Sequence, residues 1–454
     1  MFSAEKFRAN EGYIIMKIIK INLLLLSVVF ILLIAGSAQA QLNYREDAVV
    51  VRADMIPAIS GTAINVLSLM RFNGKNFEPI PFQIDEKTKD NNFVYTNGQK
   101  KNPQDGNNKF DGKDELVFMA WDSGALAPPN TKFPENSISG VQILLTDYVR
   151  NNSGAVYLFV FSANPPLSKI DYVQNLTEEG RNVVKTERYY FGEPIGKGYF
   201  DRLALIGPDG KVGPNLVDRI KGRGHIQSMG VLKFNAGEYN TPAPLVAWID
   251  GPVRVIRRME GGVEILGLKL KLSGGSDNVF YRNYFYTPIF FSLPPGLSSL
   301  LKGSYMIYTI DFNSKFKGSY YFDQVNKTPT IIDGKMDSQE KALDTKTNHN
   351  WYAVGGDKGN LIERMIVPAQ WRDYVNMTTF YIDDDKEQDP PEDEPGRHQF
   401  GFKLEGMFEA PAGKYNYYIY YMVPDKKVTK ENVSVWLDIL DHPLKIQVQP
   451  LVKE

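Results

Sequence analysis

The chain is built from short segments in which β-branched and aromatic residues alternate with polar ones, each bounded by Gly, Pro or Asn. Because successive side chains of a strand face opposite sides of a sheet, this alternation predicts half-buried β-strands. The gaps between segments are often the length of a hairpin turn, so mostly antiparallel sheets are expected. The clearest segments are 48–52, 64–70, 141–146, 155–161, 253–259, 263–272, 279–286, 305–312, 378–382 and 415–422.

One helix is predicted near the C-terminus, whereas long amphipathic helical patterns are missing from the rest of the sequence. Thr429 is a good N-cap, and Pro443 ends the helix. Apolar residues between them repeat with the spacing of one helix face, at Val433, Trp436, Leu437 and Leu440. A final strand is predicted over residues 444–451. The expected fold class is therefore all-β, with antiparallel β-sandwich domains and one C-terminal helix.

A domain boundary is predicted at Asn164-Pro165-Pro166, which interrupts the strand pattern. Residues 41–165 are expected to form an N-terminal β domain, and residues 166–454 a large C-terminal β-sandwich domain. The larger part has the length of a supersandwich or of two packed sandwiches.

The N-terminus predicts export. Lys17 and Lys20 precede an apolar run over residues 21–35, which ends in the small-residue cleavage pattern Ala38-Gln39-Ala40. Residues 1–40 therefore read as a signal peptide, and Met16 fits the true start better than Met1 because the first residues carry mixed charges. A signal anchor that stays in the membrane is the alternative. The mature chain is expected off the membrane, in the periplasm or outside the cell at the surface of a bacterium.

Composition excludes several classes of function. The chain has no cysteine, which excludes disulfides, thiolate metal sites and cysteine nucleophiles. Lys and Arg total 52 against 53 Asp and Glu, so the chain has no overall basic surface for nucleic acid. Local basic patches such as Lys221-Gly222-Arg223 are too short to change this expectation.

A loop rich in Asn and Asp has the ligand spacing of an EF-type calcium site. Counting from Pro103, oxygen ligands fall at positions 3, 5, 7, 9 and 12, which are Asp105, Asn107, the Lys109 carbonyl, Asp111 and Asp114. Glu115 would replace Asp114 after a shift of one residue, and Pro103 offers no side-chain oxygen at position 1. The loop predicts bound calcium, and a plain solvated turn is the alternative. The acidic stretch 383–394 predicts an exposed loop, with a second calcium site as its alternative.

Few residues suggest catalysis. His225 lies among glycines that suggest an accessible loop, and Arg254 and Tyr281 lie on predicted strands. Together they would supply what a uronate lyase needs: a cation for the substrate carboxylate and a base for the α-proton. These three residues are the catalytic candidates.

Aromatic rows suggest binding instead. Tyr189–Phe191, Tyr281 to Tyr286 and Tyr415 to Tyr421 place rings at strand spacing, where exposed rings would stack on sugars and buried rings would pack in the core. The preferred reading is a binding or structural role, with a polysaccharide or cell-surface component as the partner. A polysaccharide lyase or glycoside hydrolase is the alternative.

Two short motifs resemble those of known exported proteins. Residues 81–85 (PFQID), followed by the Asn/Asp-rich loop and residues 114–119 (DELVFM), resemble a signature of exported bacterial β-sandwich proteins of unknown function. Residues 251–254 (GPVR) are similar to a strand of secreted β-sandwich proteins associated with polysaccharide degradation, some with a galactose-mutarotase-like supersandwich. The resemblance implies a secreted β fold with an ion near the N-terminal domain. It carries over no catalytic residue.

Overall fold

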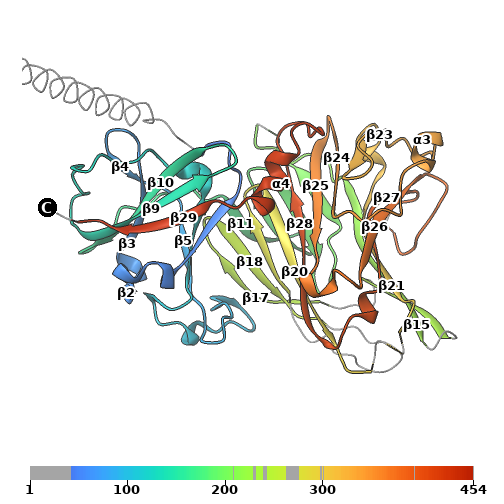
Figure 1. Cartoon of the computed structure of the whole chain (residues 1–454), viewed down its shortest axis with the longest axis horizontal. Helices are drawn as coiled ribbons and strands as arrows, with labels where there is room; N and C mark the ends of the chain where they lie inside the picture. The colour runs from blue at the N-terminus through green and yellow to red at the C-terminus, as the bar shows by residue number, and fades with distance from the viewer. Residues whose placement is uncertain are drawn as a thin grey trace, which may run out of the picture.

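The computed structural model describes residues 42–452, apart from 208, 229–231, 239–242, 262–275, 297–298, 300 and 393. The predicted signal peptide, residues 1–40, and the predicted strand 263–272 lie outside the described residues. Within them, strands dominate and every pairing between named strands is antiparallel (Figure 1). The predicted all-β, antiparallel fold class is confirmed.

The N-terminal part contains two sheets that enclose a common apolar core, which includes Val49, Leu69, Phe118, Ile143 and Leu158. The three-stranded sheet has the order β1 (Ala48–Arg52), β8 (Glu115–Met119), β5 (Gln83–Asp85). The five-stranded sheet has the order β29 (Lys445–Pro450), β9 (Ser137–Asp147), β10 (Asn152–Phe161), β3 (Leu67–Phe72), β4 (Phe77–Pro79). A small pair, β2 (Thr62–Ala63) with β7 (Lys109–Phe110), lies beside the Asn/Asp-rich loop.

Three further sheets are formed mainly by the rest of the chain. The four-stranded sheet has the order β11 (Val173–Glu178), β12 (Arg181–Thr186), β13 (Tyr189–Pro194), β14 (Arg202–Leu205). The five-stranded sheet has the order β16 (Leu232–Gly237), β15 (Val217–Ser228), β21 (Tyr305–Phe312), β27 (Arg397–Glu405), β26 (Asn376–Asp384). The ten-stranded sheet has the order β23 (Thr330–Ile331), β22 (Tyr320–Asp323), β24 (Trp351–Gly356), β25 (Gly359–Ile366), β28 (Gly413–Met422), β20 (Tyr284–Leu293), β19 (Ser276–Tyr281), β18 (Arg254–Met259), β17 (Leu245–Asp250), β6 (Asn97–Gly98).

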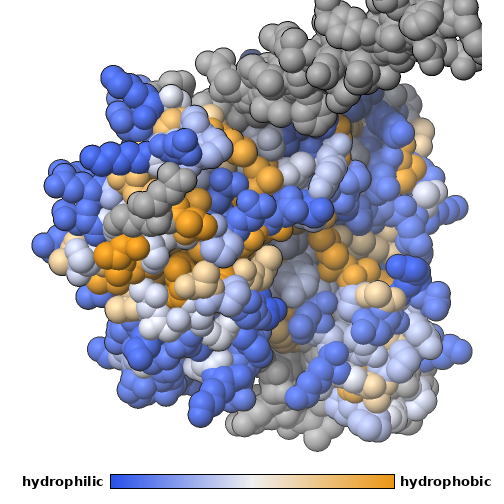
Figure 2. Space-filling view, turned by 60° about the vertical axis from the view of Figure 1, so that its left-hand side comes forward, coloured by the Kyte–Doolittle hydropathy of each residue, from blue (hydrophilic) through white to orange (hydrophobic). Residues whose placement is uncertain are grey.

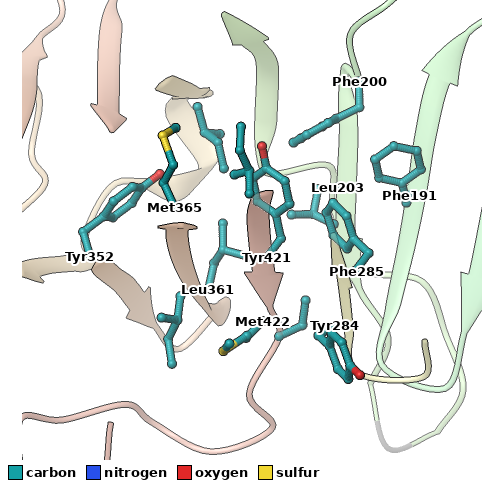
Figure 3. Packing of buried hydrophobic residues seen from close by; sticks show 14 of the residues in the cluster. Phe191, Phe200, Leu203, Tyr284, Phe285, Tyr352, Leu361, Met365, Tyr421 and Met422 are labelled. Atoms are coloured by element: carbon teal, nitrogen blue, oxygen red, sulfur yellow. The ribbon is translucent and has the colours of Figure 1, made fainter. Parts of the chain in front are cut away.

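The four-stranded sheet and the five-stranded sheet that contains β15 both pack on one face of the ten-stranded sheet. The register of β24, β25, β28 and β20 puts Tyr352, Tyr421 and Phe285 on the same face, because residues directly opposite in an antiparallel pair point the same way. The Tyr352 ring lies 5.7 Å from Phe402, which is on β27 of the five-stranded sheet that contains β15. The Tyr421 ring lies 5.7 Å from Phe200, which precedes β14 of the four-stranded sheet (Figure 3). The largest core of the protein therefore lies between the long sheet and its two covers.

Local strand predictions are largely confirmed. Strands β1 and β21 have the predicted bounds, whereas the predicted single strand 279–286 is a hairpin that turns at Arg282 and Asn283. The C-terminal helix α4 (Ser434–Asp441) begins later than its predicted cap, after turns over residues 430–433. A short helix that was not predicted, α3 (Ser338–Lys341), begins with a capping box.

The predicted division at residue 165 is too simple. Strand β29 was assigned to the C-terminal domain, but it pairs with β9 of the first unit, with Val448 opposite Ile143 (Figure 1). Strand β6, from the first part of the chain, pairs with β17 at the end of the ten-stranded sheet. The two units therefore exchange edge strands, and the chain returns to the first sheet after α4.

The surface is mixed in polarity. On the face drawn in Figure 2, apolar side chains lie in patches between charged ones. No helix in the part of the chain that the structure describes is long and apolar enough to cross a membrane.

Candidate functional site

The Asn/Asp-rich loop is anchored by Asp114. This carboxylate is buried, and its two oxygens accept hydrogen bonds from the backbone N–H groups of Lys87, at 2.7 Å, and Asp111, at 2.9 Å. Burial raises its pKa above the usual value. Glu115, the alternative ligand, instead contacts Lys87 at 3.2 Å and Arg254 at 2.5 Å. Neither carboxylate is free to close a calcium shell at position 12.

The other predicted ligands also bond within the protein. Asn107 accepts from the Lys109 N–H at 2.8 Å and donates from Nδ2 to Asp111 at 3.0 Å. Asp105 accepts from the Asn102 amide at 2.9 Å. Across residues 42–452, as far as described, no three His, Asp or Glu side chains are placed to hold a metal ion. The arrangement does not fit a calcium shell, so calcium stays a prediction of the sequence alone.

Gln83 joins the two motifs that resemble other exported proteins. Its Oε1 accepts the N–H groups of Val253 and Arg254 at 3.0 and 2.8 Å, and its Nε2 donates to Asp85 at 2.9 Å. A Cβ on Gly251 would lie 2.4 Å from Gln83 Oε1, so this close approach requires glycine. PFQID and GPVR therefore dock on each other and join the three-stranded sheet to the ten-stranded sheet.

Arg254 lies at the centre of this junction. It is 1% exposed, and its guanidinium donates to Asp85 at 2.8 Å, to Glu115 at 2.5 Å and to the Tyr281 hydroxyl at 3.1 Å. Although burial alone would raise the pKa of Glu115, the charges of Arg254 and Lys87 hold it below the usual value. Because these donors are used by buried protein groups, the cluster of Arg254, Asp85 and Glu115 holds the two sheets together and offers no site for a substrate carboxylate. We call this cluster the buried lock.

The three catalytic candidates do not form one site. Arg254 and Tyr281 are paired on β18 and β19. His225 lies on β15 in the five-stranded sheet, where its ring stacks on Tyr305 at 4.5 Å and burial lowers its pKa. The aromatic rows are mostly core: Tyr189, Tyr190, Phe191, Tyr281, Tyr284, Tyr415, Tyr417 and Tyr421 are all buried.

The acidic stretch is docked and not simply solvated. Lys221 is fully buried, and its ammonium lies 2.7 Å from Asp311 and 3.3 Å from Glu392. Arg223 contacts Asp389 at 3.3 Å. The basic strand segment 221–223 is therefore neutralised by the protein's own acidic loop.

A polar and aromatic cluster that the sequence analysis did not identify lies where six connections meet. We call it the Trp121 site. Its members come from the segment before β1, the turn after β8, the segment before β11, the β12–β13 turn, the β19–β20 turn and the segment after β28. They are Glu46, Trp121, Asp122, Tyr172, Glu187, Arg188, Arg282, Asn283 and Asp425. Loops that converge on a rigid β scaffold are the usual location of binding residues.

Trp121 organises the aromatic half of this site. Its partly exposed indole donates to the Tyr172 hydroxyl at 3.3 Å, and the two rings meet edge to face at 5.7 Å. The Arg282 guanidinium lies over the indole, 4.4 Å from the ring centre. Tyr172 donates to Asp122 at 3.0 Å, and burial raises the pKa of Asp122 to about 6.

The charged half surrounds Glu46. Burial raises the pKa of this carboxyl, and Asn283 Nδ2 donates to its side chain and to its carbonyl, both at 2.8 Å. Arg188 and Arg282 each approach it at 3.9 Å. Arg188 also pairs with Asp425 at 2.9 Å, and Arg282 with Glu187.

The sequence held one signal for this site. Residues 120–124 (AWDSG) directly follow the DELVFM motif and form a 3-10 turn over Ala120–Asp122 that places Trp121 and Asp122 at the end of β8. The farthest member, Asp425, is more than 300 residues from this turn, so no spacing rule points to the remaining members.

Comparisons with known proteins identify no family. No family model and no curated protein matches the chain. Two similar solved structures are an alpha-mannosidase from Enterococcus faecalis, at 8% identity and a TM-score of 0.45, and a glycosyl hydrolase family 38 protein from the same organism, at 6% and 0.44. Each alignment covers 92% of this chain but only 45% and 47% of the other. The chain thus spans less than half the length of either protein.

Proposed function

We propose that this is an exported saccharide-binding protein that uses the Trp121 site to hold its ligand. The observation that carries the proposal is the partly exposed Trp121 indole, held between Tyr172 and Arg282 beside the Asp122 carboxyl. Saccharides have apolar C–H faces and a rim of hydroxyls, so their sites combine an aromatic ring with a few fixed polar groups. The Trp121 site has this composition.

Binding is favoured over a lyase-type reaction because the predicted catalytic set is not assembled. Arg254 and Tyr281 are 1% and 2% exposed, and His225 belongs to another sheet. The Trp121 site, in contrast, keeps its arginines about one-fifth exposed, at 20% for Arg188 and 19% for Arg282. A ligand can reach these groups without opening the core.

Glycan arrays and calorimetry with the purified mature protein test the proposal. Binding of at least one oligosaccharide is expected, with a loss of affinity of roughly fivefold or more in Trp121→Ala, since an aromatic contact contributes roughly 1 kcal/mol or more. Trp248→Ala on β17 is the matched control, because it removes another partly exposed indole outside the site. An array without binding, or equal losses in both variants, would contradict the proposal.

Asp122 favours a carbohydrate-active enzyme as the second candidate. A carboxyl with a pKa of about 6 keeps its proton at mildly acidic pH, as a general acid of glycoside cleavage does. Incubating the protein with polysaccharides tests this reading. Release of oligosaccharides by the native protein but not by Asp122→Asn would establish it, and absence of release would leave binding as the function.

A further inference from the structure

We infer that the Trp121 site takes neutral saccharides and rejects acidic ones such as oligouronates. This inference rests on the proposed function, because it assigns the ligand class of the same site. It follows from the charges that surround the indole and from the partners that each arginine already has.

Carboxyl groups outnumber guanidinium groups at the site. The carboxyls are Glu46, Asp122, Glu187 and Asp425, and the guanidiniums are Arg188 and Arg282. Four negative and two positive charges leave a net charge of two negative when all carboxyls are ionised. Arg71 also lies near Asp122, but it is paired with Glu78 at 2.5 Å and adds nothing to this sum. A ligand carboxylate would enter a region that is already negative.

Both arginines already face carboxylates of the protein. Arg282 contacts Glu187 and lies 3.9 Å from Glu46. Arg188 lies 2.9 Å from Asp425 and 3.9 Å from Glu46. A uronate that pairs with either guanidinium would lie beside at least one carboxylate of the protein that already faces the same group. Such juxtaposed like charges weaken binding at an interface.

The hydroxyl groups of a neutral saccharide can bond to these carboxylates without charge repulsion. A carboxylate accepts hydrogen bonds and does not donate them, so Glu46, Glu187 and Asp425 are suited to the O–H donors of a neutral sugar. The Trp121 indole supplies the apolar contact. Arg282, already stacked on that indole at 4.4 Å, presents N–H donors to the ring and hydroxyl oxygens of the same ligand without a change of partner.

A panel of two tetrasaccharide classes tests the inference by calorimetry. The probes are the neutral manno-, xylo- and cello-tetraoses and, as the acidic one, tetragalacturonic acid. We expect one or more neutral probes to bind at least tenfold more tightly than tetragalacturonic acid, and the Trp121→Ala variant to lose this binding. Glu187→Gln should narrow the difference in affinity between the neutral probes and tetragalacturonic acid by raising the affinity for the acid. Glu179→Gln is the control, because it removes an exposed carboxyl that pairs with Arg202 outside the site.

The outcomes separate this inference from the function on which it rests. Tighter binding of tetragalacturonic acid than of every neutral probe, lost in Trp121→Ala, would overturn the neutral assignment and retain saccharide binding at this site. Failure of every probe and of the wider glycan array to bind would overturn the proposed function itself. Equal effects of Glu187→Gln and Glu179→Gln would show that the local charges do not set specificity.

Discussion

Replacing Arg254 with Met should destabilise the protein by about 3–5 kcal/mol, because it leaves buried carboxylates without their cation. Asp85 is 2% exposed and would keep only the Gln83 amide as a partner. Glu115 would keep Lys87, at 3.2 Å. The expected loss therefore comes mainly from Asp85, whose ion pair with Arg254 has an N–O distance of 2.7 Å. Met preserves most of the buried side-chain volume, so a cavity contributes little.

Urea unfolding at neutral pH, followed by tryptophan fluorescence, measures this loss. A double-mutant cycle with Asp85→Leu isolates the pair: the double variant should be more stable than Arg254→Met alone, because it removes the unpaired buried charge. Arg202→Met is a matched control, since its partner Glu179 is 71% exposed and exposed pairs contribute 1 kcal/mol or less. A loss below about 1 kcal/mol for Arg254→Met, or purely additive effects in the cycle, would refute the buried lock.

Other predictions concern groups outside this lock. Burial raises the pKa of Glu363 to about 8, so between pH 4.5 and about 8 this carboxyl is protonated in the folded protein but ionised in the unfolded chain. The free energy of unfolding should therefore fall as pH rises through this range. Urea titrations at several pH values should show this fall in the native protein, and Glu363→Gln should remove it. Melting curves in calcium and in chelator should coincide; a calcium-dependent rise, roughly 2.7 kcal/mol at a hundredfold excess over Kd, that disappears in Asp105→Ala would show instead that the loop binds the ion. Lys221→Met should release the acidic loop, seen as faster proteolysis within residues 385–392, whereas Lys211→Met, at an exposed turn, should leave the cleavage rate unchanged.

Secondary structure was predictable because it depends on neighbours in the sequence. Alternation of apolar and polar residues placed β1 and β21 at their observed bounds. The hairpin at Arg282 and Asn283 is hidden in the sequence, since the residues on both sides continue the same aromatic pattern. A two-residue turn without glycine leaves little trace in such a pattern.

The roles of the charged residues were less predictable. The spacing of Asp105, Asn107 and Asp111 matches a calcium loop, yet Asp114 and Glu115 are engaged by Lys87 and Arg254. The acidic loop looked solvated because its composition is polar, and only the fold brings buried Lys221 against it. In each case the partner comes from a distant segment, which a local motif does not encode.

The sequence by itself determined an antiparallel β protein with a late helix, because strand and helix periodicity are properties of consecutive residues. The tertiary structure alone decided which strands pair, so that β29 returns to β9 and β6 extends the ten-stranded sheet. It also decided that Arg254 is a structural ion-pair partner, through a hydrogen bond to Asp85 across 169 residues of chain. The Trp121 site is also decided by the tertiary structure, because its residues come together only where six separate connections converge. Burial and charge pairing depend on distance in space, and that distance is set by the packing of the sheets.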